Sequence, residues 1–119
     1  MNQDELKNRT KQFALRIIKL AEALPNIVRG KAIGGQLVRA GTSVASNYRA
    51  SCRSRSKAEF IAKTGVVEEE ADESGFWLEM IIESELLKKH LVEPLLQEAN
   101  ELTAIMASSR KTAKGNDKR

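Results

Sequence analysis

The sequence predicts an all-α protein, an antiparallel up-down-up-down bundle of four helices. Its apolar residues are mostly Leu, Ile, Val and Ala, with five aromatic residues among 119, which suits helix packing better than a β-sandwich. These apolar residues recur at spacings of three and four, which places them on one face of a helix. Short connections between such amphipathic helices give antiparallel neighbours.

The first two helices are expected over about residues 4–24 and 30–54. Residues at alternating spacings of four and three form one apolar stripe along the first helix: Leu6, Thr10, Phe13, Ile17, Leu20 and Leu24. Pro25 ends that helix because the residue before a proline avoids the helical conformation. The second helix has its own stripe of Leu37, Gly41, Val44 and Tyr48. At 100° per residue, three arginines fall on the side opposite this stripe: Arg39, Arg49 and Arg53.

The third and fourth helices are expected over about residues 57–90 and 94–108. Ser56 and Glu59 form a capping-box pattern at the start of the third helix. Glu70 falls on its buried face, where a carboxylate needs a partner. The third helix also contains two glycines, which are tolerable where another backbone approaches closely: Gly65 and Gly75. In the fourth helix, Pro94 suits the first turn.

The charged residues are segregated along the chain. Residues 23–58 contain seven basic side chains and no acidic one, whereas residues 68–101 contain eleven acidic and two basic ones. Residues 1–109 form the predicted domain and carry 15 basic and 15 acidic groups. The net charge of +4 therefore resides in residues 110–119, a predicted disordered basic tail. The pI of about 9.4 is thus weak support for nucleic-acid binding by the folded part.

Composition also bears on the cellular compartment. No apolar run approaches the roughly 18 residues of a membrane span, and the polar, acidic N-terminus is unlike a secretory signal. The single cysteine, Cys52, cannot form an internal disulfide and is expected to be a small buried or half-buried residue. We therefore expect a cytoplasmic protein without membrane contact.

A search for catalytic motifs predicts no enzyme. The only histidine is His90, and Leu87 stands where the Glu-x-x-His pair of a di-iron bundle would need a carboxylate. Metal-binding, phosphate-loop and nucleophile-elbow motifs are absent from the sequence. The acidic run over residues 68–73 is interpreted as a solvated face with one or two partners for Arg39 or Arg49. We predict no catalytic residue, metal or cofactor.

Several blocks of sequence carry a family resemblance. They are residues 36–48 (QLVRAGTSVASNY), Ser56 with residues 59–61 (EFI), residues 70–74 (EADES) with 77–79 (WLE), and more weakly 101–106 (ELTAIM). In order and spacing the chain resembles the four-helix bundle proteins of 23S ribosomal RNA intervening sequences. That family is related to accessory variability determinants of diversity-generating retroelements, which partner a reverse transcriptase.

The resemblance implies a ring-like homo-oligomer, a pentamer, with a basic surface proposed to bind nucleic acid. If it holds, the first candidates for phosphate contact lie near the end of the second helix and its connection: Arg49, Arg53, Arg55 and Lys57. A second set is assigned to a structural polar network between helices or subunits: Arg39, Asn47, Glu70 and Glu73.

Two functions remain open from the sequence. The first is a non-enzymatic, nucleic-acid-associated module that contacts RNA, DNA or an RNA–protein complex through phosphates without reading sequence. The second is a scaffold whose segregated charges dock a partner protein, with any nucleic-acid affinity incidental.

Overall fold

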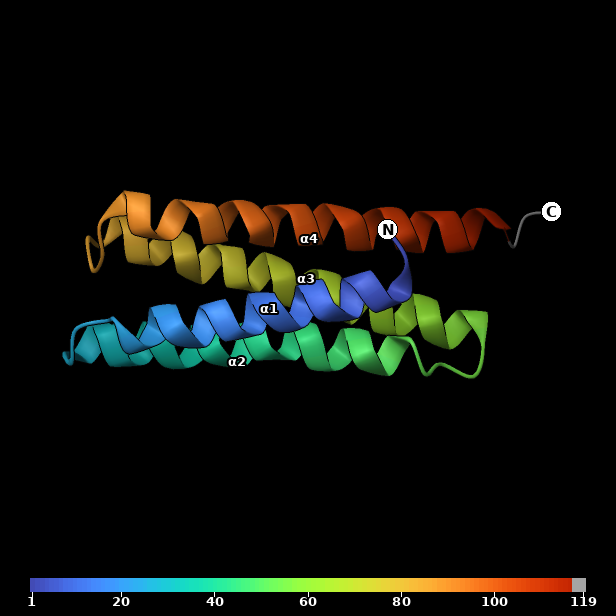
Figure 1. Ribbon diagram of the computed structural model, residues 1–119, viewed down its shortest axis with the longest axis horizontal. Coiled ribbons are helices and arrows are strands. Elements are labelled where there is room, and N and C mark those ends of the chain that lie inside the picture. The colour runs from blue at the N-terminus through green and yellow to red at the C-terminus, as the bar shows by residue number, and fades with distance from the viewer. Residues whose placement is uncertain (117–119) are drawn as a thin grey trace.

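The computed structural model describes residues 1–116, and within them the chain forms four α-helices and no strand. They are α1 (Gln3–Glu22), α2 (Val28–Ser51), α3 (Lys57–Glu83) and α4 (Lys89–Asn116). The predicted all-α, four-helix class is confirmed. The helices lie side by side along the long axis of a body of 52 × 21 × 20 Å, and their connections fall at alternate ends (Figure 1).

Local sequence signals start two of the helices. The Asn2 side chain accepts a hydrogen bond from the Glu5 backbone N–H at 2.8 Å, and the Ser56 hydroxyl accepts one from Glu59 N–H at 3.1 Å. Each cap satisfies a backbone donor that the first helical turn leaves unpaired. Ser56 therefore caps α3 at the residue that the sequence predicts.

The core is a single cluster drawn from all four helices, and the predicted stripes of the first two helices contribute to it. α1 contributes Leu6, Phe13 and Ile17, and α2 contributes Leu37, Val44 and Tyr48. From α3 and α4 come eight fully buried apolar residues: Val67, Ala71, Leu78, Ile81, Val92, Ala99, Leu102 and Met106. Burying large aliphatic side chains stabilises the fold by about 1.5–3 kcal/mol each, relative to leaving them exposed.

α1 and α2 pack in direct contact at Gly41. A methyl group added there would lie 2.8 Å from both Cγ1 and Cγ2 of Ile17, whose side chain is fully buried. The sequence pointed instead to Gly65 and Gly75, but a methyl group at either would meet only ordinary contacts of 3.5 Å or more. Glycine at position 41 therefore allows Ile17 of α1 to pack against α2.

The predicted end of the third helix at about residue 90 is wrong. α3 stops at Glu83, and Glu85 adopts a left-handed conformation with φ of 58°. The Glu85 N–H donates to the Ile82 carbonyl at 3.0 Å and the Leu86 N–H to the Ile81 carbonyl at 3.1 Å, which is a Schellman motif. Leu86 is buried beside this cap. A glutamate stands where glycine is usual, so the sequence carried no stop signal.

The predicted boundaries of the fourth helix and of the tail are also wrong. α4 starts at Lys89 and reaches Asn116, so residues 110–116 are helical and not disordered; residues 117–119 of that predicted tail lie outside the described residues. Pro94 is the sixth residue of α4, where it removes only the backbone bond to the His90 carbonyl. The Arg110 side chain donates to Glu68 Oε1 on α3 at 2.9 Å, which holds the extended helix against the bundle.

Replacing Gly41 by alanine should destabilise the protein by about 1–3 kcal/mol, because the added methyl group overpacks Ile17. Gly35 is the matched control: it lies in the same helix with nothing within 4 Å of an added methyl group. Gly35→Ala should stabilise by about 0.5–1 kcal/mol through helix propensity. Urea denaturation followed by circular dichroism measures both values, and equal effects of the two substitutions would contradict the close contact.

Candidate nucleic-acid interface

A basic groove lies between α1 and α2, beside the predicted candidate Arg49. Its volume is about 510 Å³, and it is lined from α1 by Lys7, Asn8, Lys11 and Ala14 and from α2 by Thr42, Ala45, Ser46 and Arg49. The lining therefore combines three cations with two alanines, two hydroxyls and one amide.

Two of the three cations in the groove have no carboxylate partner. Lys11 and Arg49 take part in no ion pair among the described residues, while Lys7 meets the exposed Asp4 at 3.3 Å. The sequence analysis missed Lys7 and Lys11 because both lie on the polar face of an amphipathic helix, where lysines are usual. Lys7 and Lys11 differ from other surface lysines only in their position in the groove, across from Arg49.

The other predicted phosphate contacts lie beyond this groove. Arg53 and Arg55 are exposed in the connection between α2 and α3, and Lys57 is the first residue of α3. Neither arginine forms an ion pair within residues 1–116. Arg49, in the last turn of α2, links these three residues to the groove.

The predicted polar network joins three of its four residues. Arg39 Nη1 donates to Glu70 Oε2 at 3.0 Å, and Arg39 Nη2 donates to Glu73. The Glu70 carboxylate raises the pKa of Arg39 because it accepts a hydrogen bond from the charged guanidinium. Trp77 Nε1 extends the network with a contact of 3.4 Å to Glu73 Oε2. Asn47 lies elsewhere: its amide donates to the Ser43 carbonyl of its own helix at 2.9 Å.

A second arginine ties the first helix to the last. Arg9 Nε donates to Glu98 Oε2 at 2.7 Å, while Nη2 donates to Glu98 Oε1 at 2.6 Å and to Glu101 at 2.9 Å. The bidentate bond to Glu98 raises the pKa of Arg9. The pKa of Glu101 is lowered by hydrogen bonds from Gln97 and then Arg9. These contacts neutralise acidic groups of α4 inside the chain.

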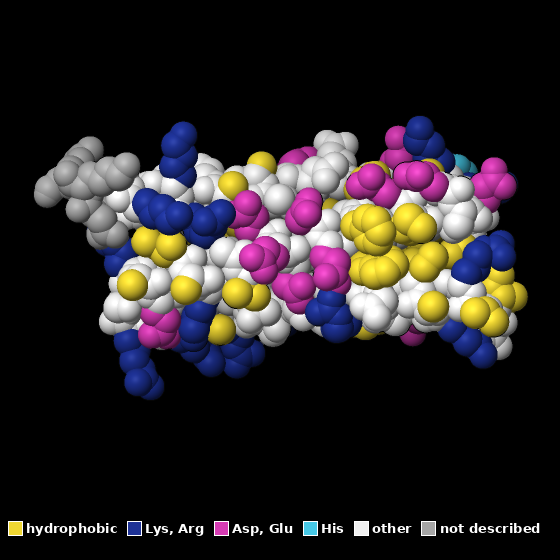
Figure 2. Space-filling view, turned by 180° about the vertical axis from the view of Figure 1, so that it is seen from behind, with side chains coloured by type: hydrophobic (Ala, Val, Ile, Leu, Met, Phe, Trp, Pro, Cys, Tyr) yellow, Lys and Arg dark blue, Asp and Glu magenta, His cyan; other side chains and the backbone are white. Residues whose placement is uncertain are grey.

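The distribution of charge over one face agrees with these pairings. Asp and Glu gather over the middle of that face with basic side chains beside them, and further Lys and Arg lie toward its ends (Figure 2). A patch of apolar side chains adjoins the acidic group in the same view. Phe76 on α3 is 50% exposed, and its ring meets Trp77 edge-on at a centroid distance of 4.9 Å.

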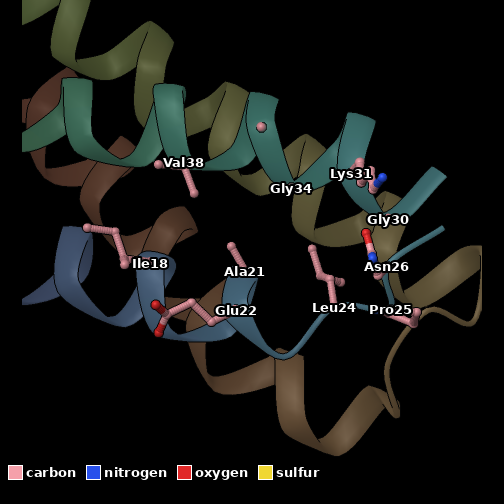
Figure 3. Close-up of a pocket in the computed structure, with 11 residues that line it drawn as sticks. Ile18, Ala21, Glu22, Leu24, Pro25, Asn26, Gly30, Lys31, Gly34 and Val38 are labelled. Carbon is pink, nitrogen blue, oxygen red and sulfur yellow. The ribbon is translucent and has the colours of Figure 1, made fainter. Parts of the chain in front are cut away.

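The other end of the α1–α2 interface opens into a different cavity of about 530 Å³ (Figure 3). Ile18, Leu24, Pro25 and Val38 contribute most of its apolar lining, and Glu22 faces it from α1 (Figure 3). Only one cation, Lys31, lines this cavity, so it offers no cluster for phosphate. The basic groove is therefore specific to one end of the helix pair.

The described residues show no obvious reaction centre. No group of three or more His, Cys, Asp or Glu among residues 1–116 is placed to hold a metal ion. His90 is exposed at the start of α4, and Cys52 is half-buried after α2. In this part of the chain no helix is long and apolar enough to cross a membrane.

The fold and the basic groove together define a small all-α bundle protein with a cationic groove between α1 and α2. The model of the 23S rRNA-intervening sequence protein family matches residues 3–108, nearly the whole chain. The chain therefore belongs to this family, as the sequence blocks indicated.

A solved structure supports the same assignment. The chain is similar to a protein of unknown function from the S23 ribosomal protein family of Bacteroides thetaiotaomicron, whose crystal structure extends to 1.70 Å. The two share 30% identity with a TM-score of 0.83, over 89% of this chain and 98% of the other. No match was found among curated proteins.

Glu70→Lys should lower the melting temperature, because it places a second cation opposite Arg39 and removes the carboxylate that Arg39 contacts. The matched control is Glu69→Lys, at an exposed position of the same helix with the same charge change. Thermal unfolding and particle mass should change in the first variant and stay near wild type in the second. If the Glu70→Lys protein kept the melting temperature and particle mass of wild type, the Arg39–Glu70 contact would not stabilise the structure.

Proposed function

We propose that the protein is a non-enzymatic module that assembles as a ring-like homo-oligomer of up-down-up-down bundles and binds nucleic acid through phosphates. One observation carries the nucleic-acid part: Lys11 and Arg49 line one groove and have no carboxylate partner within the described chain. Unpaired cations that converge across a groove attract a polyanion more strongly than the same charges paired on a surface.

The lining of the groove favours contact with the phosphate backbone over base recognition. Lysine, arginine, asparagine and hydroxyl side chains are the usual donors to phosphate and sugar oxygens. Thr42 and Ser46 supply hydroxyls and Asn8 an amide, but no aromatic ring lines this groove for base stacking. The expected binding is therefore insensitive to sequence and strongly dependent on salt.

Arg53, Arg55 and Lys57 extend the proposed contact surface. Arg53 and Arg55 of the α2–α3 connection and Lys57 at the start of α3 follow Arg49 at this end of α2. An RNA or DNA strand in the groove could continue over this connection and meet further charges. Each phosphate contact releases condensed counterions, so affinity should fall steeply as salt rises.

The double variant Lys11→Glu with Arg49→Glu should bind structured RNA and duplex DNA at least tenfold more weakly at low salt. The slope of log affinity against log salt should also fall by about two, one unit for each lost phosphate contact. Fluorescence anisotropy of a labelled RNA hairpin and a labelled DNA duplex measures both quantities. Arg29→Glu with Lys31→Glu carries the same charge change at exposed positions outside the groove.

If the groove variant and this control lost the same affinity for nucleic acid, net charge alone would explain the binding. That result would contradict a specific site. A third variant, Lys111→Gln with Lys114→Gln, tests the last turns of α4 in the same assay. Binding that depends only on that variant would move the site from the groove to the end of α4.

Self-association is supported by the apolar patch on α3. Phe76 and Trp77 leave an aromatic surface beside the Arg39, Glu70 and Glu73 contacts, and aromatic residues with arginine are enriched where proteins bind one another. Such a patch on a small domain is expected to be covered in the assembled protein.

Phe76→Glu should therefore shift the wild-type oligomer to a smaller species, because a carboxylate would be desolvated inside the contact. Sedimentation velocity on both proteins at matched concentration measures the change. Leu15→Glu is the control, since Leu15 is an exposed apolar residue of α1 with 52% exposure. An unchanged mass for Phe76→Glu would exclude this patch from the contact between copies.

The alternative function is a scaffold that docks a partner protein, and the same exposed aromatic pair favours it. A scaffold would bind nucleic acid only through incidental charge, so the groove variant and its control would then lose affinity equally. The anisotropy experiment thus separates the two functions.

A further inference from the structure

A second groove lies between α1 and α4 and takes no part in the proposed nucleic-acid contact. Its volume is about 360 Å³, within the range of roughly 300–1,000 Å³ that ligand pockets occupy. Apolar side chains form its floor: Leu20, Ala23, Leu87, Leu91, Pro94 and Leu95. Two cations from α1, Arg16 and Lys19, complete its lining. Leu91 is 54% exposed, so an apolar surface is open to solvent here.

The contacts of Arg9 show what Arg16 lacks. Arg9 and Arg16 are seven residues apart, or two helical turns, and so lie on the same stripe of α1. Arg9 meets Glu98 and Glu101 on α4, which runs antiparallel to α1. Seven residues earlier on α4, opposite Arg16, stand Leu91 and Pro94. The arginine stripe therefore continues, but apolar side chains replace the carboxylates that would pair with it.

The charges around the groove are unbalanced toward the positive. Arg16 and Lys19 form no ion pair among the described residues. Glu93, the nearest acidic residue in sequence on α4, already lies 3.9 Å from Lys89. α4 also begins at this end of the groove, and the N-terminus of a helix carries a partial positive charge. An occupant with carboxylates would complement this potential.

We propose that the α1–α4 groove binds an amphipathic helix of a partner protein whose contact face combines apolar side chains with carboxylates. The apolar residues of that helix would pack on Leu20, Leu91 and Leu95, and its carboxylates would pair with Arg16 and Lys19. Two neighbouring antiparallel helices with an apolar channel between them are the usual receptor for a third helix. A carboxylate of the proposed partner would pair with Arg16, as the Glu98 carboxylate pairs with Arg9.

A display library of 18-residue helical peptides, randomised along one face, tests this proposal with the full-length protein as bait. The enriched peptides should carry apolar residues at helical spacing with an excess of Asp and Glu beside them. Fluorescence anisotropy of one enriched peptide then compares variants. Arg16→Gln with Lys19→Gln should weaken its affinity at least tenfold and reduce its dependence on salt.

Leu91→Glu is the sharpest variant, because it places an internal carboxylate opposite Arg16 and removes an exposed apolar contact. It should weaken peptide binding more than Leu91→Gln, which removes the apolar contact alone. Val28→Glu places a carboxylate at an apolar residue of α2 that is 87% exposed and lies outside the groove, and it should leave peptide affinity within twofold of wild type. Circular dichroism confirms that each variant retains its helices before affinities are compared.

The proposal would be overturned if the wild-type bait enriched no peptides beyond those that the Leu91→Glu bait enriches. It would also be overturned if the enriched peptides showed no excess of Asp and Glu. A third contrary result is equal affinity of the peptide for wild type and Leu91→Glu. Displacement of the peptide by RNA would assign the groove to nucleic acid and would overturn it too. The Lys11→Glu, Arg49→Glu protein should bind the peptide normally. Failure of nucleic-acid binding and failure of helix binding are thus distinguishable.

Discussion

The arrangement of the bundle depends on the contact between Ile17 of α1 and Gly41 of α2. With no side chain at position 41, the Ile17 side chain packs directly against the backbone of α2. The basic groove lies on one side of this point, near Ala14 and Ala45, and the cavity of Figure 3 lies on the other. The Ile17–Gly41 contact therefore lies between the two openings of this helix pair.

Pairing inside the chain decides which charges remain available to partners. The acidic surface of α3 is occupied in part by Arg39 and Arg110, and that of α4 by Arg9. Each of these arginines pairs with a carboxylate on a helix other than its own, so these pairs hold the helices of the bundle together. Cations without such a pair among the described residues include Lys11, Arg16 and Lys19 on α1, Arg49 at the end of α2, and Arg53 and Arg55 in the α2–α3 connection. A chain with balanced charge over residues 1–109 thus still presents concentrated positive surfaces.

The helices were predictable from the sequence, because apolar spacing decides which face is buried, and the stripes of α1 and α2 lie in the core as expected. The end of α3 was not predictable, since Glu85 adopts a backbone conformation that sequence rules reserve for glycine. The tail was misjudged because its helix is held by Arg110 and Glu68, which are 42 residues apart. Lys7 and Lys11 gave no signal either. A groove exists only after two helices meet, and spacing along one helix does not reveal it.

The extension of α4 to Asn116 changes the character of its terminal charges. Arg110 makes its contact with Glu68, and Lys111 and Lys114 follow in the last turns. On a helix these lysines are separated by about 4.5 Å along the axis, from three residues at 1.5 Å each. Their backbone is already ordered before any partner arrives, so association does not have to restrict it further. In solution this helical segment would hold its lysine side chains at a fixed spacing and in a fixed direction relative to the bundle.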